Sequence, residues 1–452
     1  MGLLARFVPW LFVPLLFGLP VLGCDDDEGT GGTGGATSSG GGTGTGGTST
    51  SSGGGAGGTS TSSSGGGGGA APGCPAAALG NALGRDHLFV GGSMDDTSFA
   101  TAPFDIRYQY MAGNVPTGGP CSSCATGCTV DGSSCSNNEG CSWWGCWQYD
   151  QDPPGRFVAD FVAEADQAGA VPMISYYIWY SVAGDVEGQQ EIAALNDGSR
   201  VTSYLADFRF LCEVLAEDPS VTTIIHLEPD LWGYGHQLTD DPETLPVALS
   251  AAGDPACAGL SDTFGGLARC LMAIADQVAP HVLVGFHASA WGAGADALTN
   301  DNPQFDLAGH AAETASFMQA LAADQADLVV VEMSDRDAGF NNRWWDASDA
   351  TLPHFAQAIE WVAALGNGLD LAPLWWQVPY GHPGLPNVCD QYEDNRVDYV
   401  LDHPERFAAG GALGVAFGAG AGCMTTPATD GGHFTTRAAA YFQGARPLLC
   451  GN

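Results

Sequence analysis

Two acidic residues at the end of a predicted strand are the side chains of this sequence best suited to chemistry. The stretch TTIIHLEPD, residues 222–230, runs from β-branched residues into Glu228 and Asp230, which Pro229 separates. A carboxyl group that keeps its proton can donate it to a leaving group, while an ionised one activates water or attacks carbon. We expect Asp230 to be the general acid and Glu228 to orient it or bind substrate. Alternatively, Asp230 caps a helix and Glu228 pairs with an arginine.

A second carboxylate should follow another predicted strand. The apolar stretch at 327–335, DLVVVEMSD, contains Glu332 and ends in Asp335, and Asp337 comes two residues later. These three are our candidates for the catalytic base. Asp185 is a candidate for a residue that modulates the acid.

Aromatic and amide side chains gather where other predicted strands end. Tryptophan and tyrosine rings can stack on the apolar faces of sugar rings, while amides and acids bind the hydroxyl groups. A single buried tryptophan is more often part of a core, so we rely on the group as a whole. The expected substrate-binding residues are Tyr177, Trp179, Trp232, His287, Trp291, Trp375, Trp376, Gln377 and Tyr380.

The elements that must position these side chains are short apolar runs that alternate with amphipathic stretches. Repeated strand and helix, with both strand faces apolar, predict a parallel sheet covered by helices. Eight such units in about 380 residues predict an α/β fold of the (β/α)8 TIM-like barrel type, distorted near its first link, which lacks a clear helix. An open doubly wound sheet is the alternative. The predicted strands are 87–92, 104–111, 171–180, 222–230, 281–289, 327–335, 372–381 and 411–420. The predicted helices are 155–168, 204–218, 261–278, 310–323, 353–365, 394–408 and 435–445.

The first 72 residues look like an export signal followed by a tether. Residues 1–23 carry one charge, Arg6, and an apolar run that prolines interrupt, which is typical of a cleaved signal peptide. The residues before Cys24 resemble a bacterial lipobox, so we expect Cys24 to be lipidated; an ordinary signal peptide is the alternative. A Gly/Ser/Thr-rich linker occupies 24–72 and the barrel domain 73–452. The lipid would be the only membrane attachment, and it would hold the protein at the cell envelope, in the outer membrane or on the cell surface.

Cysteines in an exported chain favour disulfides. Six of the 14 cysteines crowd into an insertion at about 114–150, after the second predicted strand. Zinc bound by Cys121 and Cys124 is the alternative there, although we expect no metal site. Outside the insertion, we expect three disulfide pairs and a buried free thiol at Cys212. The pairs are Cys74–Cys450, Cys257–Cys270 and Cys389–Cys423.

The insertion also contains three tryptophans. Trp143, Trp144 and Trp147 lie in the stretch CSWWGCWQYD. They could form a wall or lid of a sugar-binding groove. Ordinary packing of the insertion is an equally good interpretation.

The charge balance excludes several functions. The chain has 13 basic residues, all of them arginine, against 51 acidic ones, for a net charge of −38. Nucleic acid would be repelled, and chemistry that needs a catalytic lysine is ruled out. We therefore expect a monomer that binds a polysaccharide or oligosaccharide and needs no cofactor. Structural calcium is conceivable at the acidic pairs Asp95–Asp96 and Asp240–Asp241.

Several of these motifs, in order along residues 171–385, resemble the inverting family 6 glycoside hydrolases. HLEPD is similar to that family's Glu-Pro-Asp strand end, and FHASAW to its His-Ala-Gly-Trp segment. The stretches ISYYIWY, EMSDRDAG and WWQVPYGHPG are similar to further segments of that family. The resemblance implies a distorted barrel, Asp230 as general acid and a β-1,4-glucan-type substrate. The family's Asp-Arg-Asp-Cys is replaced here by residues 180–183, so the resemblance does not identify the base.

These observations predict a surface-tethered glycoside hydrolase that cleaves a polysaccharide with inversion. A retaining mechanism using Glu228 and Glu332 is one alternative, and the carboxyl separation decides: about 5 Å for retention and about 6.5–9.5 Å for inversion. A carbohydrate-binding lipoprotein on a degenerate barrel is another. A metal-dependent hydrolase using His226 and His287 is the third, although no metal-binding motif supports it.

Overall fold

The computed structural model describes residues 74–113, 115, 128–130, 133–135, 147–148 and 153–451. The expected signal peptide, the lipidated Cys24 and the linker lie outside these residues. So do Trp143, Trp144 and most of the cysteine-rich insertion, of which the two-stranded antiparallel sheet β3 (Cys128–Val130) and β4 (Ser133–Cys135) is described.

Eight parallel strands close into a barrel in the order β1-β10-β9-β8-β7-β6-β5-β2. The (β/α)8 prediction is therefore confirmed, and the open-sheet alternative is wrong. Each predicted strand range contains one of these strands, except that β2 extends one residue beyond 104–111. They are β1 (Phe89–Gly92), β2 (Ile106–Ala112), β5 (Val171–Tyr177), β6 (Ile224–Leu227), β7 (Leu283–His287), β8 (Leu328–Glu332), β9 (Ala372–Val378) and β10 (Gly414–Phe417).

The barrel is irregular at the position where the sequence lacks a helix. β1 and β2 are joined by a link whose only helix is α2 (Asp96–Phe99), and two residue pairs, Gly91–Ile106 and Gly92–Arg107, connect them. By contrast, β2 and β5 pair over seven positions. The pairing of β1 with β2 is thus the shortest in the barrel.

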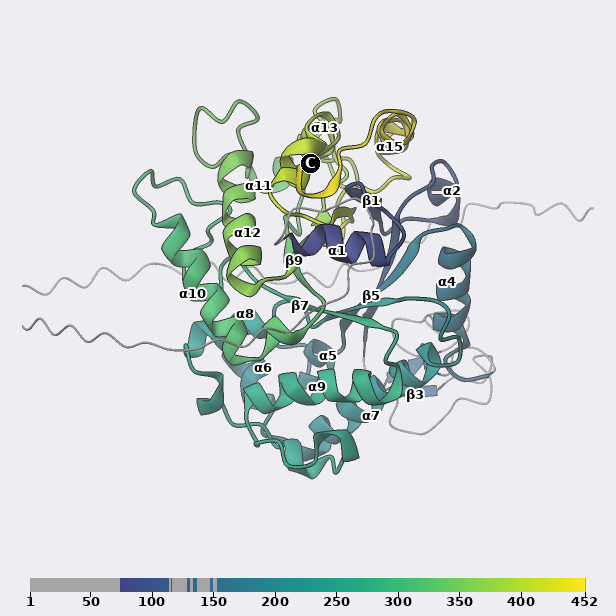
Figure 1. Ribbon diagram of the computed structural model, residues 1–452, viewed down its shortest axis with the longest axis vertical. Coiled ribbons are helices and arrows are strands. Elements are labelled where there is room, and N and C mark those ends of the chain that lie inside the picture. The colour runs from purple at the N-terminus through teal and green to yellow at the C-terminus, as the bar shows by residue number, and fades with distance from the viewer. Residues whose placement is uncertain are drawn as a thin grey trace, which may run out of the picture. The chain divides into compact units, whose positions relative to one another are not determined.

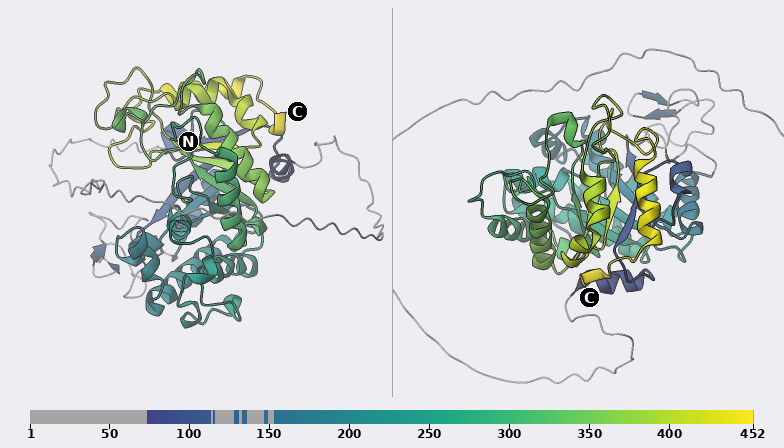
Figure 2. Two further views of the ribbon diagram at one scale, coloured as in Figure 1. Left: turned by 90° about the vertical axis from the view of Figure 1, so that its left-hand side faces the viewer. Right: turned by 90° about the horizontal axis from the view of Figure 1, so that it is seen from above.

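Helices surround the barrel, and the longer ones begin at side-chain caps (Figures 1 and 2). Asp197, Thr263 and Asp306 each accept a hydrogen bond from a backbone N–H in the first turn of the helix that follows. The helices are α1 (Pro75–Ala82), α4 (Arg156–Gln167), α5 (Trp179–Ala183), α6 (Gln189–Ala194), α7 (Gly198–Leu215), α8 (Leu231–Leu238), α9 (Phe264–Val278), α10 (Leu307–Ala320), α11 (Ala338–Asn341), α12 (Phe355–Leu369), α13 (Arg396–Asp402), α14 (Pro404–Ala409) and α15 (His433–Gln443). Each predicted helix range contains helix, but the range predicted as one helix at 394–408 is divided into two, α13 and α14.

Every second residue of each strand points into the barrel, and these residues form an inner core. On β8, Leu328 and Val330 belong to this core, whereas Val329 and Val331 belong to the larger core between barrel and helices. α1 packs against the inner core through Ala76 and Ala77. Because the period of a strand is two, the next inward position on β8 is Glu332, at the end of the strand. The same alternation brings polar side chains into the barrel mouth on several strands.

The three expected disulfides outside the insertion are present. Cys74–Cys450 joins residues 376 positions apart, and α1 lies beside the C-terminus (Figures 1 and 2). The other two are Cys257–Cys270 and Cys389–Cys423. Cys212 is a buried free thiol, as expected.

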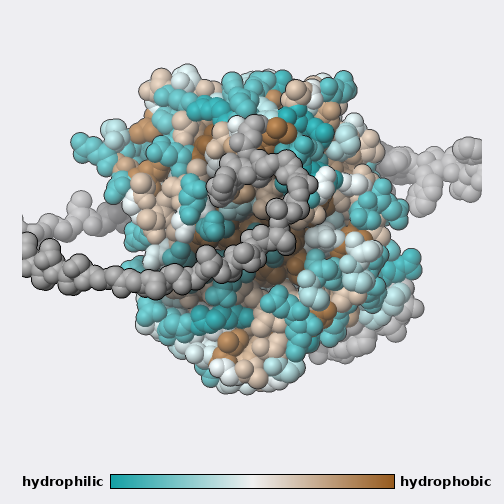
Figure 3. All heavy atoms as spheres, viewed as in Figure 1, coloured by the Kyte–Doolittle hydropathy of each residue, from teal (hydrophilic) through white to brown (hydrophobic). Residues whose placement is uncertain are grey.

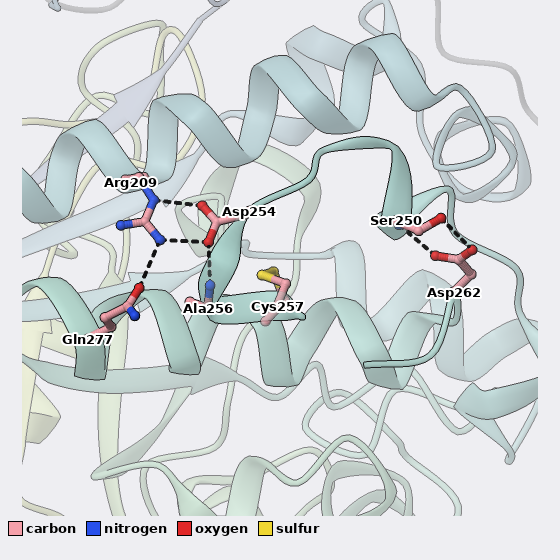
Figure 4. The surroundings of a disulfide bond; sticks show 8 residues. Arg209, Ser250, Asp254, Ala256, Cys257, Asp262 and Gln277 are labelled. Carbon is pink, nitrogen blue, oxygen red and sulfur yellow. Dashed lines mark hydrogen bonds and ion pairs between the residues drawn. A yellow bond between two sulfur atoms is a disulfide. The ribbon is translucent and has the colours of Figure 1, made fainter. Parts of the chain in front are cut away.

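The segment that contains Cys257 is further held by ion pairing to a helix (Figure 4). Asp254 accepts two hydrogen bonds of 2.6 Å from the Arg209 guanidinium on α7. Nearby, the Ser250 hydroxyl donates to Asp262 over 2.8 Å. These contacts fix the long connection between α8 and α9.

The face shown in Figure 3 is largely hydrophilic, with hydrophobic side chains in smaller patches, as the acidic composition requires. Within the described residues, no helix has both the length and the apolar character to cross a membrane. Trp147 is fully buried and stacks on Phe210 of α7 with ring centres 5.6 Å apart. For Trp147, the packing interpretation holds and the lid interpretation is wrong.

Candidate active site

A pocket of about 450 Å³ opens at the carboxyl ends of the barrel strands. In a parallel barrel all strands end at the same mouth, so side chains far apart in sequence meet there. The strand-end residues in its wall are Tyr110, Tyr177, Asp230, His287, Glu332, Trp376 and Gln377. All of them except Tyr110 were predicted from the sequence.

The backbone around Asp230 explains why two acids so close in sequence end in different places. Glu228 and Asp230 have φ angles of 42° and 72°, in a region that non-glycine residues rarely adopt. Gln377, also in the pocket wall, has a φ of 55°. Each such residue costs about 1–3 kcal/mol, and residues of this kind cluster at functional sites. The two turns on either side of Pro229 direct Asp230 into the pocket and Glu228 away from it.

Glu228 is fully buried. Its carboxyl group accepts hydrogen bonds from the backbone N–H groups of Ile178 (3.3 Å) and Trp179 (3.1 Å), just after β5. Burial raises the pKa of Glu228 to about 8. Glu228 therefore ties the end of β5 to the loop that carries Asp230. Because Glu228 does not line the pocket, the structure gives no support to the expectation that it binds substrate.

Asp230 and Glu332 come together with His287 at the centre of the pocket. One carboxyl oxygen of each acid and one ring nitrogen of His287 lie within 4.8 Å of one another. The Tyr177 hydroxyl hydrogen-bonds to Asp230. The Gln377 amide donates to Glu332 Oε1 over 2.7 Å and accepts from the Tyr110 hydroxyl. Each acid is thus held by a neutral partner, with free oxygen atoms left for a substrate.

The two carboxyl groups make each other harder to ionise. Burial raises the pKa of Asp230 to about 7, and the charges of Glu187 and Asp335 act in the same direction. Burial, followed by the charges of Asp230 and Asp335, holds the pKa of Glu332 well above its usual value. Two buried like charges at this distance cannot both form easily, so the pair keeps a proton near neutral pH. One proton is therefore shared by Asp230 and Glu332 as a pair.

His287 is held by a chain of polar side chains inside the barrel. The Ser175 hydroxyl lies 3.1 Å from His226 Nδ1, and His226 Nε2 lies 3.1 Å from His287 Nδ1. Burial lowers the pKa of His287 to about 3, so the ring is neutral. Within the described residues, His287 Nε2 has no hydrogen-bond partner. It could bind a substrate hydroxyl or, with the two acids, a divalent cation.

Aromatic rings form another part of the pocket wall. Trp376 packs against Tyr110 with ring centres 5.2 Å apart, and Trp291 lies 4.9 Å from Tyr234. Tyr177 stacks on Tyr180 at an interplanar angle of 10°. Such rings, mixed with acids and amides, suit molecules that have apolar faces and polar edges, as sugars do.

Two predicted tryptophans are buried in packing beside α5 and α8 instead of lining the pocket. Trp179 is fully buried, and its Nε1–H donates to the Glu191 carbonyl over 3.2 Å. Trp232 packs between Phe264 and Phe286. Both follow strand ends, but the helices that begin there turn the rings toward the outer core. We therefore remove both from the candidate site.

Two predicted residues near β9 are also buried elsewhere. Trp375 neighbours Trp376 on the strand, so it faces outward, against Phe407 of α14. The hydroxyl of Tyr380 donates to the Ser93 and Phe417 carbonyls, over 2.7 and 2.9 Å. Neither residue lines the pocket. The alternation along β9 could have excluded Trp375 from the sequence alone.

Of the three candidate bases, only Glu332 and Asp335 line the pocket. Asp335 is ion-paired with Arg336. Asp337 is fully buried and accepts hydrogen bonds from the Gly381 and Thr425 backbone N–H groups, so it holds loops together. Asp185 is exposed and lies outside the pocket wall.

Sequence reasoning missed several residues of the wall. Tyr110 occupies the inward position of β2 that follows Ile106 and Tyr108, and this alternation could have found it. Glu187, Tyr234 and Asp296 lie in loops or on a helix, where no comparable pattern marks them. Arg343 and Arg396 also line the pocket.

Gly420 leaves no room for a side chain beside the carboxyl pair. A Cβ atom at this position would lie 2.1 Å from Gln377 Nε2 and 2.7 Å from Asp335 Cα. We expect Gly420→Ala to displace the Gln377 amide from Glu332. A displacement of this size should lower kcat by about 10²-fold, as measured on the best substrate. Gly422→Ala is the matched control, since nothing lies within 4 Å of its Cβ position; equal losses in both variants would contradict the role of Gln377.

Solved structures of glycoside hydrolases match the chain at low sequence identity. No protein-family model and no curated protein matches the chain. An endo-β-1,4-mannanase of glycoside hydrolase family 26 from Cellulomonas fimi has 11% identity and a TM-score of 0.46, with 83% of this chain and 76% of that chain covered. The GH53 catalytic domain of Ignisphaera aggregans has 9% identity and a TM-score of 0.40, covering 82% and 94%.

A family 6 enzyme matches only in part and gives no support to the resemblance of the sequence motifs. Cellobiohydrolase II (Cel6A) from Humicola insolens has 16% identity and a TM-score of 0.30, with 52% of this chain and 60% of that chain covered. Similarity at these levels concerns the backbone architecture. The function must be argued from the side chains of the pocket.

Proposed function

We propose that this protein is a glycoside hydrolase and that Asp230 and Glu332 carry out the reaction. The observation that carries the proposal is the carboxyl pair itself: two acids within 4.8 Å, raised in pKa, in a pocket walled by aromatic rings. Glycoside hydrolysis needs two carboxyl groups in different protonation states on either side of the scissile bond. The pocket supplies both, together with rings on which a pyranose can stack.

The separation of the pair favours retention of configuration over the inversion expected from the sequence. Retaining enzymes place their carboxyl groups about 5–5.5 Å apart, whereas inverting enzymes leave room for a water between them. The oxygens of Asp230 and Glu332 approach within 4.8 Å. The retaining alternative from the sequence paired Glu228 with Glu332; here Asp230 takes the place of Glu228, because Glu228 does not reach the pocket.

Burial and neighbouring acids raise the pKa of both groups, so one of the two holds a proton near neutral pH, and we assign that proton to Glu332. Glu332 donates it to the glycosidic oxygen while ionised Asp230 attacks the anomeric carbon. The bond to the leaving group breaks and a glycosyl ester forms on Asp230. A water then gives a proton to the Glu332 carboxylate and attacks the anomeric carbon, which releases the sugar and restores both acids. The sequence motif had suggested Asp230 as the acid, and the pH dependence separates the two assignments.

We propose a polysaccharide with a β-1,4-glucan-type backbone as the substrate, and no cofactor. The rings of Trp376 and Trp291 would stack on sugar faces, and His287 Nε2 would bind a hydroxyl group. We further propose that the chain acts as a monomer at the cell envelope, tethered through Cys24 and the linker 24–72. Two experiments would test the tether separately. Globomycin should block cleavage of the signal peptide, and Cys24→Ala should abolish lipid labelling.

A polysaccharide panel tests the proposed activity. The purified full chain is incubated with β-1,4-linked glucan, mannan, xylan and galactan, and new reducing ends are measured. We expect release from at least the glucan and none from Asp230→Asn. Binding to a glycan without any reducing ends would instead support a carbohydrate-binding protein. If the protein neither binds nor cleaves any glycan of the panel, the proposed function is wrong.

The pH dependence of kcat/KM should show which acid carries the proton. The proposed nucleophile must be ionised, and Asp230 has a pKa of about 7, so kcat/KM should rise with pH through about 7. At higher pH, kcat/KM should fall as Glu332 loses its proton. A pH titration with a soluble oligosaccharide measures both limbs. If Asp230 were the acid, kcat/KM would instead fall as the pH rises through about 7.

A further inference from the structure

A second cluster of possible ligands lies outside the pocket, between two helices. His236 on α8, Asp240 just after α8 and Glu313 on α10 each offer one ligand atom, and these atoms lie within 4.8 Å of one another. None of the three lines the pocket. The cluster is therefore independent of the proposed glycosidase chemistry.

His236 is a rigid side chain that lacks a partner. Its ring is 5% exposed and stacks on Phe317 of α10, with ring centres 4.3 Å apart and planes 11° apart. Its Nε2 atom has no hydrogen-bond partner within the described residues. The nearest acid oxygen is Asp240 Oδ1, at 3.8 Å, which is too far for a hydrogen bond. A buried polar atom left in this way is costly unless something fills the gap.

The surroundings of His236 favour its neutral form. Burial lowers the pKa of His236, the charge of Asp240 acts in the opposite direction, and the charge of His310 acts with burial. A ligand at Nε2 is supported by the open position of this atom and by the two acids beside it.

We propose that His236, Asp240 and Glu313 bind a divalent cation of the zinc type, which ties α8 to α10. One imidazole nitrogen and two carboxylate oxygens suit a metal of intermediate softness, whereas calcium and magnesium prefer oxygen alone. Zinc bonds of about 2.0–2.2 Å would need the acids to move inward by roughly an ångström. Both acids can do so, since Asp240 has an 85% exposed side chain and Glu313 is exposed.

The site would support the helix that follows the proposed nucleophile. α8 begins at Leu231, directly after Asp230, and carries Tyr234 in the pocket wall. Asp240, just after α8, and Glu313 on α10 bring two carboxylates within 4.8 Å of each other, and their like charges repel. A cation there would remove that repulsion and fix the end of α8. The net charge of −38 would also raise the local concentration of cations.

Zinc binding to the folded full chain tests the proposal. Metal is first removed with a chelator, and zinc per chain is then measured by equilibrium dialysis, with a thermal melt of each sample. Glu313→Gln is the main variant, because an exposed side chain can be changed without loss of folding. His236→Gln is the second variant. Both should bind zinc at least about tenfold more weakly than the unmodified chain, and zinc should raise their Tm less.

Two controls locate the zinc. His403→Gln removes another histidine that lies 3.8 Å from an acid, Glu405, but it is 47% exposed and belongs to no cluster of three. His287→Gln removes the pocket histidine. Both controls should keep the zinc that Glu313→Gln loses. Unchanged affinity in both Glu313→Gln and His236→Gln, or loss only in His287→Gln, would overturn the proposal whether or not the protein cleaves glycans.

Discussion

Replacing Asp230 with asparagine should lower kcat by about 10³-fold or more on any glycan that the protein cleaves, because the amide cannot form the glycosyl ester. The fold should survive this change. Asp230 is half-buried among other acids. The charges of Glu187 and Asp335 raise the pKa of Asp230, and the charge of Asp230 raises the pKa of Glu332, so these acids repel one another. Removing one charge relieves that repulsion, so the Tm of Asp230→Asn should stay the same or rise. A loss of activity with gained stability is typical of a site built for chemistry.

The control for Asp230→Asn is Asp324→Asn, an exposed aspartate outside the pocket. Its activity should equal that of the unmodified chain. Initial rates on the best polysaccharide and thermal melts of all three proteins complete the comparison. An Asp230→Asn variant that keeps more than about a tenth of the rate would remove Asp230 from the chemical step, since a positioned proton donor or nucleophile is worth at least 10².

Replacing Glu332 with glutamine should also stop the cleavage of natural glycans, by about 10²–10⁴-fold, because the leaving oxygen is no longer protonated. The loss should depend on the leaving group. An aryl glycoside whose phenol is already acidic needs no proton from the enzyme, so formation of the glycosyl ester should proceed at close to the normal rate. The Gln377 amide, 2.7 Å from Glu332 Oε1, can donate equally to a glutamine carbonyl at that position.

Comparing the two substrates separates an acid from a nucleophile. Glu332→Gln should show a burst of phenol followed by slow turnover, whereas Asp230→Asn should be inactive on both substrates. If the pattern is reversed, Asp230 is the acid, as the Glu-Pro-Asp motif suggested. If both variants lose both substrates equally, Glu332 acts only by holding Asp230, and the proposed division of roles is wrong.

The fold was largely predictable because each strand of a covered parallel barrel is apolar on both faces. Runs such as 327–335 stand out from the helices around them by composition alone. The link between the first two strands was too short for a long helix, and the structure has only α2 there. Local composition was therefore sufficient to predict the architecture. The alternation of strands and helices was sufficient to predict that the carboxyl ends of the strands lie together.

The site was less predictable, because the direction of a side chain at the end of a strand depends on the local backbone angles. Asp230 and Glu332 were both expected, but nothing in the sequence showed that the φ angles on either side of Pro229 would direct Glu228 away from the pocket. Trp375 and Trp376 differ only in which face of β9 they occupy. The two-residue period of a strand would have been sufficient to predict the direction of the Trp375 side chain. It cannot predict the direction of Glu228, because the strand ends there.

Contacts between distant residues were beyond any local pattern. Tyr110 and Gln377 are 267 positions apart, and their hydrogen bond depends on β2 and β9 lying in the same barrel. The proposed cation site has the same character, since Glu313 meets His236 only after α8 and α10 pack together. Such clusters form only when the chain is folded. The sequence shows which residues could take part, but not which of them come together.

The configuration of the first sugar released tests the central claim most directly. The claim is that Asp230 and Glu332, close enough for direct attack, cleave a glycosidic bond through a glycosyl ester. Proton NMR of a β-linked oligosaccharide during its first minutes with the protein, before mutarotation, reveals the anomer formed. We predict the β-anomer. The α-anomer as first product would show that water attacks directly, and the mechanism proposed for this carboxyl pair would be wrong.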